Sequence, residues 1–335
     1  MPASSLQIRL LVFRFLLRSG AGYVRNILAN VIKRALGREP YFDKSEIVFH
    51  AWARYRLGLQ PKPRFTSRSL PGEGAGSQIR LTMCAINFAR AFGFTYEHTP
   101  FSEIAHAEQP IALWARAWED EFNLGDGEIA ASGPGDNVLD FARMYSGIAS
   151  RFGYRETFEL FNESAPSFRA KYFRNKIRRK SSTLMIAVHV RRGDVASKEN
   201  RGRWAEWDQV LNSVTQLKHA LEQRALSYKI RIFSDGGASE FDGAEALGCE
   251  LCVKRDALWT MRAMIEADVL VMGRGYFSYV AAIVSEGIKL FDPWGHIPPL
   301  DGWIVRDANG HFSGSAFGRA LDKKIAAQMA ACQPP

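Results

Sequence analysis

The sequence has little cysteine and no long apolar run. Four cysteines are spread over 335 residues, too few for a disulfide framework, which fits a reducing compartment. Arginines at positions 9 and 14 interrupt the apolar stretch 6–17. The stretch is therefore too short to cross a bilayer and does not read as a signal peptide. We expect a cytoplasmic protein.

Signature motifs of several enzyme classes are also absent. The chain contains no Asp-x-Asp, no Walker A sequence, no His-Glu-x-x-His and no Gly-x-Ser-x-Gly. These would mark metal-dependent transferases, P-loop NTPases, zinc proteases and α/β-hydrolases. Cys249-Glu-Leu-Cys252 stands alone, whereas a zinc site needs two further ligands. We expect no metal cofactor and interpret both cysteines as buried thiols on a strand.

Acidic residues are nearly missing from two segments that hold most of the positive charge. The net charge is +9; residues 1–40 carry seven Lys or Arg against one Glu, and residues 169–180 carry seven against no acid. The rest of the chain is therefore slightly acidic. Because no zinc-finger or RNP-type motif accompanies these patches, we expect no nucleic-acid partner.

The first 40 residues form a basic amphipathic segment in which arginines alternate with large apolar side chains. Such a helix can lie in a membrane interface, with its basic groups at anionic headgroups on the inner face. A helix packed on the protein, or a disordered tail, is an equally good interpretation. Peripheral contact with an anionic membrane is therefore one of three open alternatives.

Strands and helices alternate regularly after residue 183. This alternation predicts a parallel sheet with helices on both faces. The predicted strands are 183–190, 228–233, 249–253, 269–272 and 289–291. The predicted helices between and after them are 204–226, 240–247, 257–266, 273–285 and 316–332.

An earlier strand at 65–70, a glycine loop, a helix at 79–92 and a strand at 94–97 begin a second unit of the same kind. We expect an α/β protein with an N-terminal Rossmann-like domain at 41–180 and a C-terminal domain at 181–335.

Unusual polar residues follow three strands of the C-terminal half. They are Arg191-Arg192-Gly193-Asp194, Ser234-Asp235 and residues 273–278. Ligands bind beyond the carboxyl ends of parallel strands. Arginine forks and a helix N-terminus both suit phosphate oxygens, and a carboxylate suits the edge of guanine. These loops predict a nucleotide-diphosphate pocket that needs no metal.

The same residues resemble a known family. His189-Val-Arg-Arg-Gly-Asp194 resembles the His-x-Arg-Arg-x-Asp peptide of the α-1,2 and α-1,6 fucosyltransferases and of related protein O-fucosyltransferases. Residues 232–235 and 266–278 resemble the family's second and third motifs. Residues 74–78 resemble its Gly-x-Gly-Asn-Gln loop, with Ser77 in place of asparagine. The resemblance implies a GT-B fold, in which two Rossmann-like domains face a cleft.

The resemblance also implies an activity, namely inverting, metal-independent transfer of fucose from GDP-fucose to a glycan or glycolipid acceptor. Implied donor-binding residues are His189, Arg191, Arg192, Asp235, Gly273, Phe277 and Ser278. Implied residues of the glycine loop are Gly74, Gly76 and Gln78. Implied catalytic residues are Glu199, Asp194 and Arg191.

The general base is assigned to Glu199, with Asp194 as the alternative; an ordinary solvated loop around residue 199 is also open. A different nucleotide sugar, or a non-catalytic glycan-binding protein on the same fold, are the competing functions.

Overall fold

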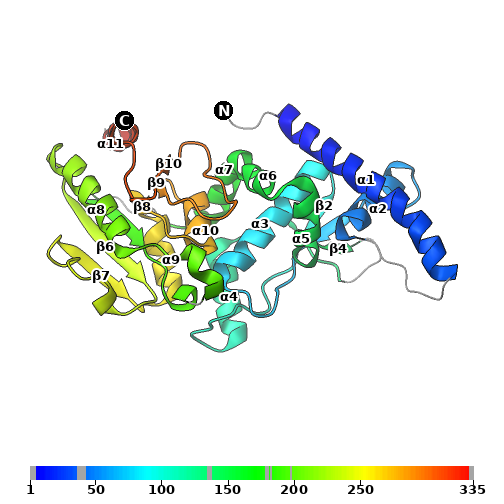
Figure 1. Cartoon of the computed structure of the whole chain (residues 1–335), viewed down its shortest axis with the longest axis horizontal. Coiled ribbons are helices and arrows are strands. Elements are labelled where there is room, and N and C mark those ends of the chain that lie inside the picture. The colour runs from blue at the N-terminus through cyan, green and yellow to red at the C-terminus, as the bar shows by residue number, and fades with distance from the viewer. Residues whose placement is uncertain are drawn as a thin grey trace. The chain divides into compact units, whose positions relative to one another are not determined.

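The computed structural model describes residues 5–35, 43–133, 138–177, 181, 183–196 and 198–331. Parts of both basic segments, residues 1–4, 36–40 and 178–180, lie outside the described residues. The chain divides into two compact units, residues 1–174 (unit 1) and 175–335 (unit 2). Each unit contains a parallel sheet with helices packed on it (Figure 1). The expected α/β fold class is confirmed.

Unit 1 contains a four-stranded sheet in the order β3-β2-β1-β4. The strands are β1 (Arg64–Thr66), β2 (Thr95–His98), β3 (Ile129–Ala130) and β4 (Val138–Asp140). Every pair in this sheet is parallel. The sequence predicts β1 and β2 but not β3 and β4, because two or three residues carry too little pattern to be read as a strand.

Within the described residues, unit 1 has seven helices (Figure 1). They are α1 (Ser5–Ala35), α2 (Lys44–Arg56), α3 (Ala75–Phe92), α4 (Ile111–Phe122), α5 (Phe141–Phe152), α6 (Tyr154–Glu159) and α7 (Phe161–Tyr172). Of these, α3 and α5 pack directly on the sheet. The long N-terminal helix α1 packs on α2, α3 and α5. Among the described residues, no helix is long and apolar enough to span a bilayer.

Helix α3 starts earlier than its sequence pattern indicates. It begins at Ala75, with Gly74 as its N-cap, so Gly76 lies in the first helical turn and not in a loop. The backbone N–H groups of Ser77 and Gln78 donate to the carbonyl of Gly74. The helix ends at Gly93, whose φ of 69° is the left-handed conformation that glycine adopts without strain.

Unit 2 contains a six-stranded parallel sheet in the order β10-β9-β8-β5-β6-β7. The strands are β5 (Leu184–His189), β6 (Tyr228–Ser234), β7 (Cys249–Val253), β8 (Val269–Val271), β9 (Ile288–Phe291) and β10 (Ile304–Val305). The first five confirm the predicted strands. The two-residue β10 was not predicted.

The helices of unit 2 mostly follow the predicted alternation. They are α8 (Trp207–Glu222), α9 (Ala257–Ile265), α10 (Tyr276–Val284) and α11 (Gly314–Ala331), with 3-10 helices η1 (Gly193–Ala196), η2 (Lys198–Arg203) and η3 (Ala238–Glu240). The helix predicted at 240–247 is wrong: after η3 the chain runs in turns to residue 248. Gly243, at φ 80°, interrupts any helix there.

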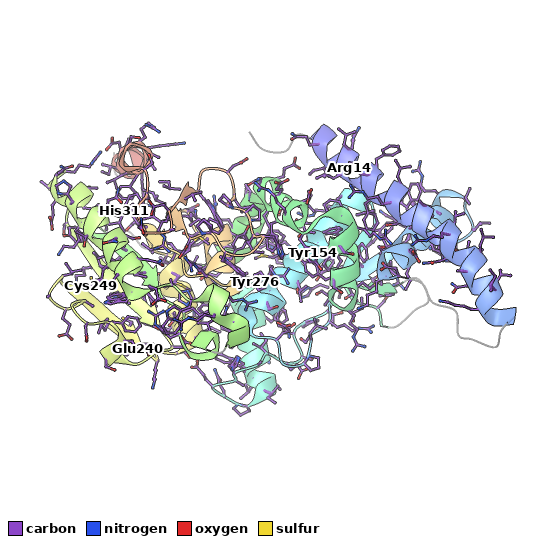
Figure 2. The ribbon with its side chains drawn as sticks, viewed as in Figure 1. Arg14, Tyr154, Glu240, Cys249, Tyr276 and His311 are labelled. Carbon is purple, nitrogen blue, oxygen red and sulfur yellow. The ribbon has the colours of Figure 1, made fainter. Side chains whose placement is uncertain are left out.

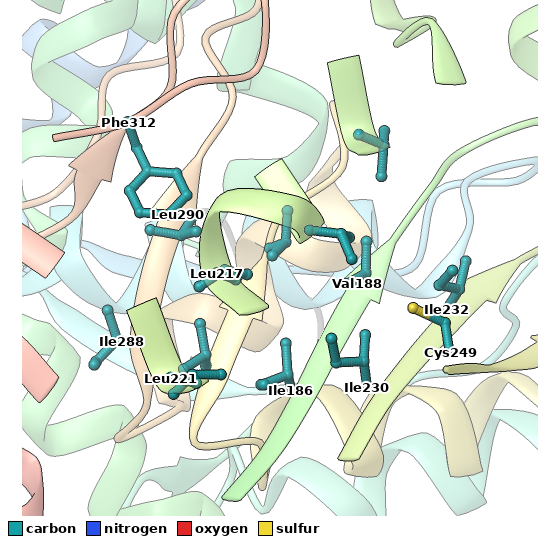
Figure 3. Close-up of a cluster of buried hydrophobic side chains, with 14 of the residues drawn as sticks. Ile186, Val188, Leu217, Leu221, Ile230, Ile232, Cys249, Ile288, Leu290 and Phe312 are labelled. Atoms are coloured by element: carbon teal, nitrogen blue, oxygen red, sulfur yellow. The ribbon is translucent and has the colours of Figure 1, made fainter. Parts of the chain in front are cut away.

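The core of unit 2 lies between one face of the sheet and helices α8 and α11. Ile186 and Val188 of β5 meet Ile230 and Ile232 of β6 under the apolar face of α8 (Figure 3). Cys249 belongs to this core, whereas Cys252 is three residues along β7 and so points to the opposite face. Both are buried free thiols, as expected from the sequence.

Candidate functional site

Strand pairing brings the three polar loops to one edge of the sheet in unit 2. His189 at the end of β5 pairs with Phe233 of β6, and Val188 pairs with Val271 of β8. All three strands are parallel, so the loops that follow them emerge side by side at their carboxyl ends. These loops, residues 190–194, 235–237 and 273–275, are called the strand-end site below.

Arg191 lies against the N-terminus of α10. A Cβ atom built on Gly275, the N-cap of that helix, would be only 2.6 Å from Nη1 of Arg191. Glycine is therefore needed for the guanidinium to approach the helix end so closely. Arg191 is half-buried, and its charge adds to the positive end of the helix dipole. The two together form an electropositive spot suited to an anion.

Arg192 has a different environment, because its side chain is only 2% exposed. Its guanidinium stacks on Trp204 at 4.0 Å and lies 3.3 Å from Glu240. Nη1 donates to the carbonyls of Arg191 and Ala205, each at 3.0 Å. These contacts show that Arg192 stabilises the loop. From the sequence alone, both arginines are equal candidates for binding phosphate.

Asp235 links the first two loops of the strand-end site. Its Oδ1 accepts a hydrogen bond from the backbone N–H of Arg192 at 2.8 Å. A Cβ atom on Gly193, at φ 50°, would be 2.4 Å from its Oδ2. A residue with a side chain at position 193 would be strained in the left-handed backbone conformation and would also clash with the carboxylate of Asp235, so this turn requires glycine. Asp235 is nevertheless exposed, so a ligand can reach it.

His189 and Gly273 link the first and third loops. A Cβ atom on Gly273 would be 2.7 Å from Nδ1 of His189 and 2.8 Å from its carbonyl oxygen. The ring also packs on Phe277, with centroids 5.7 Å apart. Nδ1 is buried and makes no hydrogen bond among the described atoms. Burial, together with the nearby charge of Arg191, lowers the pKa of His189 from 6.5 to about 4.

Ser278 forms a hydrogen bond back to the third loop. It is fully buried, and its hydroxyl donates to the carbonyl of Gly273 at 2.7 Å. The side chain thus faces its own loop, which orients the first turn of α10. For an anion at this helix end, the available donors are the backbone N–H groups that α10 leaves unpaired at its start.

The sequence did not single out the ion network beneath the third loop. Asp292, directly after β9, lies 3.0 Å from Nε of Arg274 and 3.0 Å from Nη2 of Arg306. Arg274 also donates to the carbonyl of Trp204 at 2.6 Å, and Arg306 to that of Met272 at 3.0 Å. Asp292 follows a strand at the same sheet edge as Asp235, so the same reasoning could have found it.

Asp194 lies in η1 and Glu199 in η2, the two 3-10 helices between the arginines and α8. Their side chains lie outside the part of the chain that the structure describes. The assignment of either one as a base therefore remains a prediction from the sequence.

The glycine loop of unit 1 is braced by Gln78. This side chain is buried; its Nε2 donates to the carbonyl of Leu70 at 2.8 Å, and its Oε1 accepts from the N–H of Leu70 at 3.2 Å. Beside the loop is a cavity of about 560 Å³, whose lining includes Glu73, Ser77 and Arg80. Arg80 is 3% exposed and stacks on Tyr145 at 4.5 Å.

A cavity in unit 2, of about 450 Å³, lies away from the strand-end site. It is lined by side chains of β5, β6 and α9, including Arg231, Trp259 and Arg262, and by none of the three loops. The chemistry of the loops, and not the size of this hollow, identifies the candidate site. No cluster of three or more potential metal ligands occurs among the described residues.

The fold and site define an α/β protein with two parallel-sheet units and an anion-suited sheet edge in the second. No protein-family profile and no curated protein matches the sequence. Several solved fucosyltransferase structures are similar to it. NodZ from Bradyrhizobium is 13% identical, with a TM-score of 0.34 over 76% of this chain and 98% of that one. The α-1,6-fucosyltransferase NodZ with GDP is 14% identical, with a TM-score of 0.33 over 76% and 98%.

POFUT1 in complex with GDP-fucose is 12% identical to this chain, with a TM-score of 0.35 over 68% of this chain and 96% of that one. Likeness at this level is too weak to support a conclusion about activity.

Proposed function

We propose that this protein is a glycosyltransferase that transfers fucose from GDP-fucose to a glycan or glycolipid acceptor, with inversion and without a metal. The observation that carries the proposal is Arg191 against Gly275 at the N-terminus of α10. A diphosphate leaving group needs positive charge as its bond to the sugar breaks, and a preorganised guanidinium with a helix end supplies it. The His-x-Arg-Arg-x-Asp peptide supports the same reading.

Each loop then has a role in holding the donor. Arg191 and the start of α10 bind the diphosphate, and the exposed carboxylate of Asp235 accepts hydrogen bonds from guanine. Arg192, Ser278 and Gly273 position these groups, since Arg192 and Ser278 are buried and bonded to their own loops. His189 stays neutral at physiological pH because of its lowered pKa.

The acceptor is assigned to unit 1, in the predicted N-terminal domain at 41–180 that contains the glycine loop. The cavity beside Gly74, Gly76 and Gln78 is large enough for a sugar unit and offers polar groups from Glu73 and Ser77. A base must take the proton of the acceptor hydroxyl, and Glu199 is assigned this role, with Asp194 as the alternative. The low cysteine content supports a cytoplasmic location.

Ligand-induced thermal stabilisation tests the donor. GDP should raise the melting temperature and UDP should not, because Asp235 complements the guanine edge. In a panel of nucleotide sugars with no acceptor, GDP-fucose should be hydrolysed fastest. Stabilisation by UDP instead of GDP would point to a different nucleotide sugar. Binding of GDP with no hydrolysis and no transfer to any glycan would favour a non-catalytic glycan-binding protein.

A further inference from the structure

The outward face of α1 carries a stripe of exposed apolar side chains. Eight large ones, each between 39% and 66% exposed, lie on this helix: Leu10, Phe13, Leu17, Val24, Ile27, Leu28, Val31 and Ile32. Leu10, Leu17, Val24 and Val31 are seven residues apart, which is close to two helical turns, so they lie along one face. These eight side chains are called the α1 stripe. Exposed apolar patches of this kind mark interaction surfaces.

The opposite face of α1 is docked on unit 1, which sets the direction of the stripe. Phe15 is fully buried and meets Phe92 with ring centroids 5.1 Å apart. Asn26 donates to both carboxylate oxygens of Glu46 at 2.8 Å. A Cβ atom on Gly20 would be 2.8 Å from the ring of Phe49, so helices α1 and α2 are in close contact. The helix therefore packs on the protein and still presents an apolar face outward.

The charge along α1 has one sign. The helix contains no Asp or Glu. Arg14, Arg18 and Arg25 are exposed, and each directly follows a residue of the stripe, so the three lie along one border of it. Figure 2 labels Arg14 on α1. Arginine stems can lie on an apolar surface while their guanidinium groups reach a polar boundary.

We infer that the α1 stripe docks unit 1 on the surface of an anionic lipid bilayer, with α1 in the plane of the interface. The apolar side chains enter the acyl boundary and the arginine border meets lipid phosphates. A second copy of α1 would be a poor partner, because it would bring like-charged borders together with no carboxylate on either helix. The inference does not depend on which sugar donor unit 2 binds.

Vesicle co-sedimentation of the full chain tests the inference. The chain should bind vesicles of phosphatidylcholine mixed with phosphatidylglycerol, and bind vesicles of phosphatidylcholine alone much more weakly. The affinity of the double variant Leu17→Asp, Leu28→Asp for the mixed vesicles should fall roughly a hundredfold or more. The reason is that each substitution removes an apolar side chain that the acyl boundary would bury. Arg14→Gln and Arg25→Gln should each cost about fivefold on the mixed vesicles.

The matched control is Leu113→Asp in α4, because Leu113 and Leu17 are both 57% exposed. The control should bind the mixed vesicles like the wild type, and unchanged melting curves should show that all variants are folded. Vesicle binding that is unaffected by the double variant would overturn the inference. The inference would also be overturned if the wild type formed a dimer without lipid and the double variant were a monomer. In that case a second copy of the chain would cover the stripe. Absence of binding to both kinds of vesicle would overturn it as well.

Discussion

The two adjacent arginines after β5 differ in burial. Arg192 turns inward to Trp204, Glu240 and the carbonyl of Ala205, whereas Arg191 reaches the end of α10. Adjacent residues leaving a strand point to opposite sides, so one side chain can hold the loop while the other meets a ligand. The pair of arginines thus combines a structural role for Arg192 with the proposed binding role of Arg191.

Substitution of Arg191 by lysine should weaken GDP binding by about ten- to a hundredfold, because an ammonium keeps the charge but cannot form a bidentate fork. Calorimetric titration with GDP measures the change. Arg319→Lys, an exposed position on α11, serves as the control and should bind GDP like the wild type. Equal GDP affinity in Arg191→Lys would place the diphosphate elsewhere.

His189 should make the protein less stable in acid. Its folded-state pKa of about 4 lies below its ordinary 6.5, so between these values the unfolded chain binds a proton that the folded chain does not. Stability therefore falls as pH drops from 6.5 toward 4, by up to about 3 kcal/mol. In His189→Asn this part of the pH dependence should be missing. Urea unfolding of both proteins across that pH range gives the free energy of unfolding at each pH. If this free energy changed with pH in parallel in the two proteins, His189 would not be neutral in the folded state.

Glu199→Gln should keep GDP binding and reduce transfer by roughly two to four orders of magnitude, the usual contribution of a positioned base. Glu245→Gln, an exposed carboxylate in the turn before β7, should retain full transfer. Asp194→Asn should instead impair binding and folding together. Near-normal transfer by Glu199→Gln, combined with a folded but inactive Asp194→Asn, would assign the base role to Asp194.

At the scale of elements, four glycines let the strand-end loops interlock. Added Cβ atoms at Gly193, Gly236, Gly273 and Gly275 would meet Asp235, Arg192, His189 and Arg191 respectively, all under 3.0 Å. Each contact joins a side chain from one loop, or from the end of β5 in the case of His189, to the backbone of another loop. The three sequence motifs therefore act as one packed structure.

Gly275→Ala should lower GDP affinity about tenfold or more while the protein stays folded. The new methyl group would displace the flexible end of Arg191 from the helix N-terminus, and one charge-assisted contact would be lost. Gly202→Ala is the matched control, since a Cβ atom there meets nothing within 4 Å. Titration with GDP and a melting curve for each variant separate the two effects. Unchanged affinity in Gly275→Ala would remove Arg191 from the diphosphate.

At the scale of the whole molecule, the proposed reaction relies on protein charge in place of a metal ion. Transfer should survive EDTA, because Arg191 and the start of α10 provide the positive charge for the leaving group. The rate of fucose transfer before and after chelation measures this, with a metal-dependent glycosyltransferase assayed in parallel as the positive control. A loss of activity that magnesium or manganese restores would contradict the proposal.

The sequence by itself determined the α/β class, five of the six strands in unit 2 and the three polar loops, because these depend on local periodicity and on residue types at strand ends. It could not predict strands β3 and β4 of unit 1, where the pattern is too brief, or the turns that replace the helix expected at 240–247, where Gly243 at φ 80° interrupts the helix. It also could not separate Arg191 from Arg192, or show that Asp292 pairs with Arg274 and Arg306, since contacts with residues distant in sequence determine which side chains are buried and paired.

The N-terminal helix illustrates the same division. Its mixture of arginine and apolar residues indicates an amphipathic helix, but the sequence left membrane contact and packing on the protein as alternatives. Tertiary structure decides that Phe15 and Asn26 are used inside unit 1 while Leu17 and Leu28 face outward. The physical reason is that a long helix has more apolar surface than one contact can cover, and only the position of its neighbours determines which part stays exposed.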